Sequence, residues 1–143
     1  MSKMAVVFWS QTGNTEEMAT AIAEGARTAG AEVTLKNVSE CSAEQALTYD
    51  LLALGCPAMG DEILETDEFE PFFTALEPSL KDRKIALFGS YGWGDGEWMR
   101  QWQARVIADG AQLYSGEGFI INEMPDDAGR ERCKKFGAGF AAF

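Results

Sequence analysis

The sequence predicts an α/β protein built on a doubly wound parallel sheet of five strands, with helices covering both faces. Two observations lead to this prediction. Five short apolar segments rich in strand-forming residues recur along the 143 residues, and a helical pattern follows each of them. Three of these segments are apolar almost throughout, as in strands buried between two helical layers. No linker, internal repeat or low-complexity tract interrupts the alternation, so we expect a single domain spanning residues 1–143.

The expected strands span residues 4–9, 32–37, 50–55, 84–89 and 118–122. The first, third and fourth are the almost entirely apolar ones, which is typical of central strands in a parallel sheet. The second alternates Val33 and Leu35 with polar neighbours, which suits a strand at the sheet edge. The first strand ends at Trp9, whose ring either lies in the core or flanks the loop that follows; we expect the core.

The expected helices span residues 14–28, 42–47, 68–76, 97–109 and 128–143. Gly30 ends the first helix, Ser42 caps the second, and Pro71 must lie in the first turn of the third. Trp98 and Trp102 are four residues apart on the fourth helix, and this spacing predicts packing side chains rather than ligand contacts.

The chain contains no histidine, which excludes Ser-His and Cys-His nucleophiles and most zinc and haem sites. Cys41, Cys56 and Cys133 are odd in number and form no Cys-x-x-Cys pair, so we expect reduced thiols and no metal site. The net charge of −11 repels nucleic acid and anionic membranes and attracts basic protein surfaces. A need for solubility explains the same acidity, and composition does not choose between the two interpretations.

The longest apolar runs are far too short to cross a bilayer, and the opening residues MSKM lack the apolar stretch of a secretory signal. We therefore expect a cytoplasmic protein without membrane or nucleic-acid partners. A monomer is the expected state, because the sequence indicates no large apolar patch.

Ligands of doubly wound sheets bind outside the carboxyl ends of the strands, so the loops after the first, third and fourth strands are the candidate site. The first loop, SQTGNT at 10–15, places hydroxyl and amide groups at a predicted helix start, with no Lys or Arg between Met4 and Ala26. It matches neither the P-loop nor the dinucleotide fingerprint. The N–H groups of a helix start bind phosphate directly, which without a base indicates a tightly bound mononucleotide. Ordinary helix capping explains the same residues.

The loops after the third and fourth strands, residues 56–70 and 90–98, contain Met59 and Trp93 beside glycines. Such side chains on neighbouring loops can enclose a flat aromatic ring, and they also serve as anchors on a protein's own core. Six acidic residues crowd the first of these loops: Asp61, Glu62, Glu65, Asp67, Glu68 and Glu70. They are either a solvated face or a source of negative charge that lowers the reduction potential of a nearby redox ring.

At these loops the chain resembles the short-chain flavodoxins, small FMN-containing electron carriers with a flavodoxin-like sheet of strand order 2-1-3-4-5. The phosphate loop of that family matches Ser10, Gln11, Thr12, Gly13, Asn14 and Thr15. Its two isoalloxazine loops of the clostridial type match Pro57, Ala58, Met59, Gly60, Asp61 and Glu62, and Ser90, Tyr91, Gly92, Trp93, Gly94, Asp95 and Gly96. The likeness covers essentially the whole chain, which lacks the extra loop that splits the fifth strand of long-chain members.

The resemblance implies that residues 10–15 surround the FMN phosphate, with Met59 against one face of the flavin and Trp93 against the other. It also implies that Glu62 binds the N3 side of the ring, while backbone groups near Gly92 meet the pyrimidine oxygens. These assignments come from matching positions and not from spacing or composition.

The resemblance gives Gly60 and Asp61 a redox-tuning role and implies no catalytic residue. The peptide between them would turn over on one-electron reduction, so that the Gly60 carbonyl accepts a hydrogen bond from N5 of the flavin. Glycine suits this role physically, because a residue without a Cβ changes φ at little cost.

The implied function is a low-potential one-electron carrier with tightly but non-covalently bound FMN, which passes between quinone, semiquinone and hydroquinone states. The implied partners are redox proteins with basic docking patches, such as 2-oxoacid oxidoreductases, hydrogenases and NADP reductases. The chain would not be an enzyme with its own substrate.

The sequence fits three other classes of protein less well. An FMN-dependent enzyme of similar fold is disfavoured by the absent histidine and by the lack of a substrate-domain insertion. A receiver-type signalling domain needs acids where Trp9 and Ser10 stand and a phosphoacceptor Asp where Cys56 and Pro57 stand. A Cys-x5-Arg phosphatase needs an arginine six residues after a cysteine, and no cysteine of this chain has one.

Overall fold

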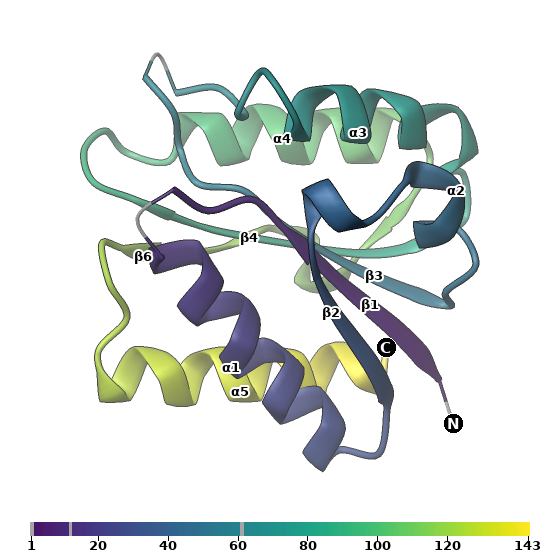
Figure 1. The fold of residues 1–143 in the computed structure, drawn as a ribbon, viewed down its shortest axis with the longest axis horizontal. Helices are drawn as coiled ribbons and strands as arrows, with labels where there is room; N and C mark the ends of the chain where they lie inside the picture. The colour runs from purple at the N-terminus through teal and green to yellow at the C-terminus, as the bar shows by residue number, and fades with distance from the viewer. Residues whose placement is uncertain (1, 12, 61) are drawn as a thin grey trace.

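The computed structural model describes residues 2–11, 13–60 and 62–143, so the predictions that concern Thr12 and Asp61 lie outside the described residues. The strands form one parallel sheet between two layers of helices (Figure 1). The prediction of a doubly wound α/β fold is confirmed.

The strands are β1 (Lys3–Phe8), β2 (Glu32–Asn37), β3 (Leu51–Gly55), β4 (Lys84–Tyr91), β5 (Gln112–Leu113) and β6 (Phe119–Asn122). The α-helices are α1 (Asn14–Thr28), α2 (Ala43–Ala46), α3 (Phe69–Leu76), α4 (Glu97–Ala108) and α5 (Asp127–Ala141). Short 3-10 helices span Val38–Glu40, Glu77–Ser79 and Tyr114–Gly116.

The sheet has the order β2-β1-β3-β4-β5, and β6 also pairs with β4. The predicted order 2-1-3-4-5 is therefore confirmed, with two short strands at its fifth position. Both of them pair in parallel with β4, one at Lys84–Ile85 and the other at Phe88–Tyr91. The predicted strand at 118–122 corresponds to β6. The two residues of β5 are too few to show the apolar pattern by which a strand is recognised in a sequence.

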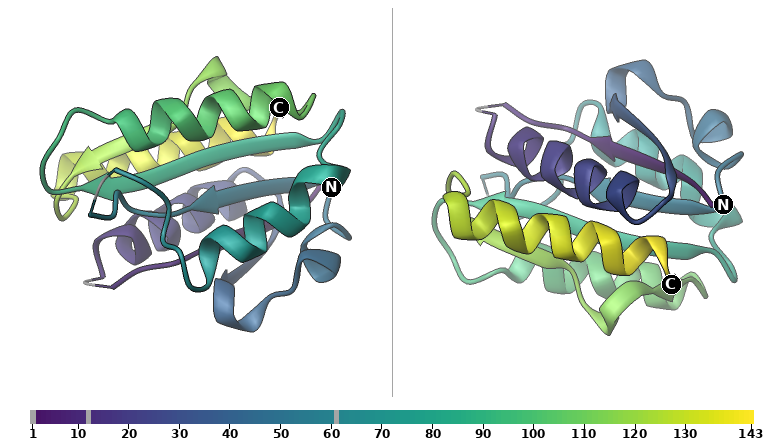
Figure 2. Two further views of the ribbon diagram at one scale, coloured as in Figure 1. Left: turned by 90° about the horizontal axis from the view of Figure 1, so that it is seen from above. Right: turned by 90° about the horizontal axis from the view of Figure 1, so that it is seen from below.

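Two helical layers cover the sheet. Helices α1 and α5 lie side by side on one face, and α3 and α4 lie on the other (Figures 1 and 2). The central strand β1 shows why its sequence is apolar throughout. Met4, Val6 and Phe8 belong to the cluster under α1 and α5, whereas Ala5 and Val7 belong to the cluster under α3 and α4. Because successive side chains point to opposite faces, every position of this strand from Met4 to Phe8 is buried, and Lys3 at its start is exposed.

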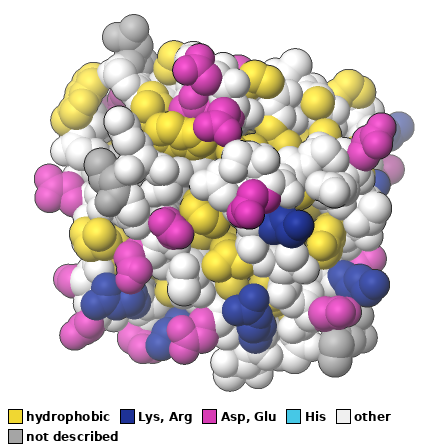
Figure 3. All heavy atoms as spheres, viewed as in Figure 1, with side chains coloured by type: hydrophobic (Ala, Val, Ile, Leu, Met, Phe, Trp, Pro, Cys, Tyr) yellow, Lys and Arg dark blue, Asp and Glu magenta, His cyan; other side chains and the backbone are white. Residues whose placement is uncertain are grey.

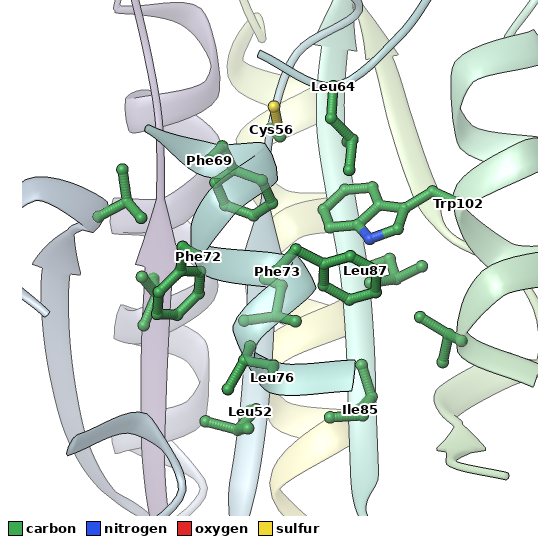
Figure 4. Packing of buried hydrophobic residues seen from close by; sticks show 14 of the residues in the cluster. Leu52, Cys56, Leu64, Phe69, Phe72, Phe73, Leu76, Ile85, Leu87 and Trp102 are labelled. Carbon is green, nitrogen blue, oxygen red and sulfur yellow. The ribbon is translucent and has the colours of Figure 1, made fainter. Parts of the chain in front are cut away.

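The second cluster is aromatic and includes both tryptophans of α4. Trp98 and Trp102 are each 1% exposed, so the prediction that they are packing residues is confirmed. The Trp102 ring meets Phe69 and Phe73 edge-on, at centroid distances of 5.4 and 5.9 Å (Figure 4). Complete burial of side chains of this size contributes about 2–3 kcal/mol each. Trp9 packs against this cluster but is only partly buried.

The helix ends follow the local signals of the sequence. Gly30 has a φ of +98° and lies two residues past the end of α1, where a glycine tolerates left-handed backbone. Ser42 and Gln45 form a reciprocal capping box at the start of α2. Pro71 is the third residue of α3, within its first turn as predicted.

Candidate functional site

The carboxyl ends of β1, β3 and β4 lie next to one another, so the loops that follow them converge. They border a cavity of about 260 Å³ that brings together Ser10, Gln11, Asn14, Thr15, Pro57, Ala58, Met59, Ser90, Tyr91, Gly92 and Trp93. Every one of these residues was predicted to bind a cofactor from the sequence. Gly13, Gly60, Glu62 and Gly94 border the same loops without lining the cavity, while Asp95 and Gly96 line a different hollow beside α4.

A larger hollow, about 440 Å³, lies at the opposite end of the strands, where residues 47–51 and 81–84 lead into β3 and β4. Its lining includes no predicted binding residue. Because ligands of doubly wound sheets bind at the carboxyl ends of strands, the smaller cavity is the candidate site.

The start of α1 forms one wall of the site. Its N-cap residue is Gly13, with a φ of +97° and no side chain to cap the helix. The Ser10 hydroxyl accepts hydrogen bonds from the backbone N–H groups of Gly13 (3.1 Å) and Glu16 (3.3 Å). Helix geometry leaves the N–H groups of Asn14 and Thr15 without an intrahelical acceptor. Capping by Ser10 is therefore real but partial, and donors for an anion remain at this helix start.

Thr15 connects this wall to the floor of the site. Its side chain is 1% exposed, and its hydroxyl lies 3.0 Å from that of Ser90 at the end of β4. The same hydroxyl oxygen accepts a hydrogen bond from the Ser90 backbone N–H at 3.3 Å. Because these bonds join residues 75 positions apart, Thr15 fixes the start of α1 against the sheet.

A tight turn after β3 forms the second wall. The Met59 N–H donates to the Ile63 carbonyl at 3.1 Å, and the Met59 carbonyl accepts from the N–H groups of Glu62 and Ile63. Glu62 adopts a φ of +56°, which is uncommon for a residue other than glycine. Ala58 donates to the Ser90 carbonyl at 3.1 Å and so holds the turn beside β4.

The loop after β4 forms the third wall and exposes Trp93. The Trp93 side chain is 67% exposed, in contrast to the buried Trp98 five residues later. Gly94 has a φ of +85°, and a Cβ at this position would lie 2.3 Å from Oε1 of Glu62. Glycine therefore allows the Glu62 carboxylate to reach beneath the loop. Within residues 2–11, 13–60 and 62–143, that buried oxygen has no hydrogen-bond partner.

Two of the six acidic residues of the 56–70 loop have structural roles. Glu65 is 6% exposed, and its carboxylate accepts hydrogen bonds from the N–H groups of Asp67, Glu68 and Phe69, each at 2.8 Å. Glu70 pairs with Arg105 at 2.7 Å, and this hydrogen bond lowers the pKa of the Glu70 carboxyl. The interpretation of the acids as one solvated face is therefore wrong for these two.

Glu68 also departs from a freely solvated carboxylate, because it accepts a 3.4 Å hydrogen bond from the indole of Trp9. On the face drawn in Figure 3, the basic side chains lie in the lower half and along the right edge. The carboxyl end of β1 points to the left in the same view (Figure 1). Glu62, Asp67 and Glu68 follow the carboxyl end of β3, so they add negative charge at the site end of the sheet.

Two anchors of the site escaped sequence reasoning. The Trp98 indole donates a 3.0 Å hydrogen bond to the Cys56 carbonyl, which links α4 to the loop after β3. The buried carboxylate of Glu65 was treated as one surface charge among six. An acid a few residues before a predicted helix was the available signal, because carboxylates accept hydrogen bonds from the first turn of a helix.

The three walls fit one kind of ligand. The open N–H groups of α1 and the hydroxyl of Ser10 suit a phosphate, and Met59 and Trp93 suit a flat ring. The unpartnered Glu62 oxygen is available to accept a hydrogen bond from an N–H group of such a ring. A phosphorylated aromatic cofactor such as FMN meets all three demands. No group of three metal-ligating side chains occurs in the part of the chain that the structure describes.

Comparison with known proteins gives a consistent result. The sequence model of the flavodoxin family matches residues 6–137. The chain is 46% identical to a flavodoxin of Clostridium beijerinckii over 96% of its length and 99% of that protein. It is also 46% identical to a flavodoxin of Megasphaera elsdenii, over 95% of this chain and 96% of that one. The solution structure of two-electron reduced Megasphaera elsdenii flavodoxin has a TM-score of 0.88 at 45% identity, covering 98% of this chain and 99% of that one.

Proposed function

This chain belongs to the flavodoxin family, and from this premise we propose how its residues hold and tune the cofactor. The protein is an FMN-binding electron carrier and not an enzyme that turns over a substrate. Bound FMN supplies the one-electron chemistry, while the chain binds the cofactor, orients its ring and sets its electrostatic surroundings.

The phosphate of FMN binds at the start of α1. The N–H groups of the first turn supply donors and the partial positive charge of the helix. Ser10 and Asn14, which line the cavity, supply further polar groups, and Gly13 leaves room for close approach. The predicted contribution of Thr12 lies outside the described residues and stays a prediction. The Thr15 hydroxyl already bonds to Ser90, so we assign it a positioning role.

The ring binds between the other two walls. Met59 covers one face and Trp93 the other, and both line the cavity. The orphaned Oε1 of Glu62 accepts a hydrogen bond from the N3 side of the ring. Tyr91 and Gly92 lie at the same border, where their backbone groups reach the pyrimidine oxygens.

The turn at Gly60 tunes the redox chemistry. Apart from its two chain neighbours, no atom of the described residues lies within 4 Å of a Cβ added to Gly60, so the residue has room to change conformation. We assign its carbonyl oxygen the role of accepting a hydrogen bond from a protonated nitrogen of the reduced ring. The acids around the turn raise the free energy of an added electron and lower the reduction potential.

The partners are redox proteins that present basic patches to this acidic end. Long-range attraction between opposite charges speeds such encounters, and it weakens as salt is added. Candidate classes are 2-oxoacid oxidoreductases, hydrogenases and NADP reductases. In the chain outside residues 1, 12 and 61, no helix is both long and apolar enough to cross a membrane. A monomeric protein acting in the cytoplasm accords with this proposal.

The exposed Trp93 beside the open start of α1 is the observation that supports this proposal most directly. The test is anaerobic stepwise reduction of the FMN-loaded protein, followed by absorbance. We expect two resolved one-electron steps, the second at much lower potential. A single two-electron step would contradict the carrier mechanism.

Gly60→Ala gives the matching residue-level test. The substitution should bring the two one-electron potentials closer together while FMN affinity, measured by fluorescence titration, stays within about twofold of wild type, since the added methyl meets open space. Unchanged potentials would remove the role assigned to Gly60.

A further inference from the structure

The segment from Pro57 to Leu64, here called the Met59 loop, is fastened at its base. The residues that flank it, Cys56 and Glu65, are both buried, at 0% and 6% exposed. The Glu65 backbone N–H donates a hydrogen bond of 3.4 Å to the Cys56 sulfur. Burial raises the pKa of the Cys56 thiol, so the sulfur accepts this bond in its neutral form. A loop that leaves the sheet thus returns to within hydrogen-bond distance of its own start.

The Cys56 end of the loop is held by two further elements. Its N–H donates to the Phe88 carbonyl of β4 at 3.1 Å, which continues the strand pairing. Its carbonyl accepts the 3.0 Å hydrogen bond from the Trp98 indole of α4. These bonds leave the Cys56 backbone no free donor and fix it in the core (Figure 4).

The Glu65 end is held by the start of α3. The three bonds to its carboxylate, each 2.8 Å long, are charge-assisted and therefore stronger than bonds between neutral groups. Helix α3 is itself immobilised, because Phe69 and Phe73 pack on Trp102 (Figure 4). Glu65 thus ties the end of the loop to the aromatic core.

Between these ends the loop has few restraints. Among the described residues, the Met59 backbone bonds only to Glu62 and Ile63, inside the loop itself, while the neighbouring Ala58 N–H donates to the Ser90 carbonyl of β4 at 3.1 Å. Ile63 is 43% exposed, and the space around a Gly60 Cβ is open. The base of the loop is therefore fixed at Cys56, Ala58 and Glu65, whereas the hydrogen bonds described for Met59, Glu62 and Ile63 stay inside the loop.

We propose that Cys56 and Glu65 are positioning residues that confine motion of the Met59 loop to its tip and so set the gap between the two one-electron potentials of the bound cofactor. The inference rests on the proposed function of the Gly60 turn. With a fixed base, a change at the tip costs only local rotation of the backbone. With a loosened base, the whole loop redistributes among conformations, and the turn no longer favours one redox state over the next to the same extent.

Two substitutions test the clamp. Cys56→Ala removes the sulfur that accepts the Glu65 N–H, and Glu65→Gln removes the charge and misdirects an amide N–H₂ group toward a donor. We expect each to change the equilibrium constant that relates the two one-electron steps by about tenfold, which corresponds to 59 mV for a one-electron couple. Cys56→Ser, which keeps an acceptor at this position, should restore most of the wild-type gap.

The chain offers a matched control for each variant. Cys133→Ala deletes an equally buried thiol (0% exposed) in α5, far from the loop in sequence, so it reports the effect of lost packing alone. Asp67→Asn removes one exposed negative charge two residues from Glu65, so it reports the effect of charge alone. Potentials of Cys56→Ala and Glu65→Gln that match those of their controls would overturn the proposal.

An FMN-free measurement separates this inference from the proposed function. Amide hydrogen exchange of the cofactor-free protein should show protected N–H groups at Glu65, Glu68 and Phe69, and Glu65→Gln should reduce that protection at least about tenfold. Unprotected amides in the wild type would overturn the clamp. A clamp seen by exchange, in a wild type that reduces in one two-electron step, would instead refute the proposed function and the role of the clamp in tuning.

Discussion

The starts of α1 and α3 are built on the same plan and differ in one side chain. In each, the residue three positions before the N-cap accepts hydrogen bonds from backbone N–H groups around the helix start: Ser10 before Gly13, and Glu65 before Glu68. Ser10 offers a hydroxyl that takes two N–H groups at 3.1 and 3.3 Å. Glu65 offers a buried carboxylate that takes three at 2.8 Å.

The difference separates a binding site from a structural joint. A carboxylate places a negative charge at the helix start, so the partial positive charge there is compensated by the chain itself. A hydroxyl accepts some of the N–H hydrogen bonds but leaves the partial positive charge of the helix start uncompensated, which suits an external phosphate. The N–H groups at the start of α3, which packs in the aromatic core, are thus bound by a carboxylate of the chain, whereas those at the start of α1, beside the cavity, remain available to a ligand.

The largest effect is expected where α1 is made like α3. Ser10→Glu places a carboxylate at the helix start, and its charge and its hydrogen bonds compete with the FMN phosphate. We expect FMN affinity to fall by at least about a hundredfold, roughly 2.7 kcal/mol. Fluorescence titration measures it, with Ser10→Gln as a control of equal size without charge. Equal losses in the two variants would show that size, and not charge, decides.

The converse change opens α3. Glu65→Ala leaves the N–H groups of Asp67, Glu68 and Phe69 at the helix start without their acceptor, and we expect the free energy of unfolding of the FMN-free protein to fall by about 2 kcal/mol. Urea denaturation measures this loss. Ser10→Ala should cost less than about 1 kcal/mol in the same assay, because its hydroxyl makes fewer and longer bonds. A larger loss in Ser10→Ala would reverse the comparison.

A third change isolates the backbone of the α1 start. Gly13→Ala introduces a methyl group that meets no atom within 4 Å, but the residue has a φ of +97°. The expected cost is about 1 kcal/mol of unfolding free energy, from conformation alone. Gly60→Ala is the control, since Gly60 also has open space and no positive φ. Similar stabilities of the two variants would argue against strain at Gly13.

The smallest effect concerns a carboxylate at the opposite end of a helix. Asp109 caps the carboxyl end of α4, and burial together with Glu77 raises the pKa of its carboxyl to about 6. A raised pKa means that the folded state binds the proton more tightly, so stability falls as pH rises from about 4 through 6.

Asp109→Asn should remove this decline and stabilise the protein above pH 6 by less than about 1 kcal/mol, because the side chain is partly exposed. Urea denaturation below and above that pH measures the change. A pH dependence identical to that of the wild type would show that Asp109 contributes nothing to it. Glu70 acts in the opposite sense, because its carboxyl has a lower pKa in the folded state than in the unfolded state. It therefore stabilises the protein at pH values above its unfolded-state pKa, and this stabilisation is lost as the pH falls through its folded-state pKa.

Much of the fold was readable from local patterns. The five longest strands and all five α-helices follow from apolar runs, glycine and proline positions and helical spacing, because these signals act within a few residues. The two-residue strand β5 was missed, since its structure comes from pairing with Lys84 and Ile85 and not from its own sequence. The loops of the site were located by the rule that ligands bind at the carboxyl ends of parallel strands.

The sequence by itself determined the doubly wound topology, the three loops of the site and the resemblance to an FMN-binding family. Tertiary structure decided which polar groups those loops leave free. Glu65 became an internal cap because the chain folds back onto Cys56, and Thr15 was tied to Ser90 across 75 residues. The Glu62 oxygen was orphaned beneath Gly94. Burial and hydrogen bonding depend on neighbours in space, so an acid in a row of acids does not reveal its role until the chain has folded around it.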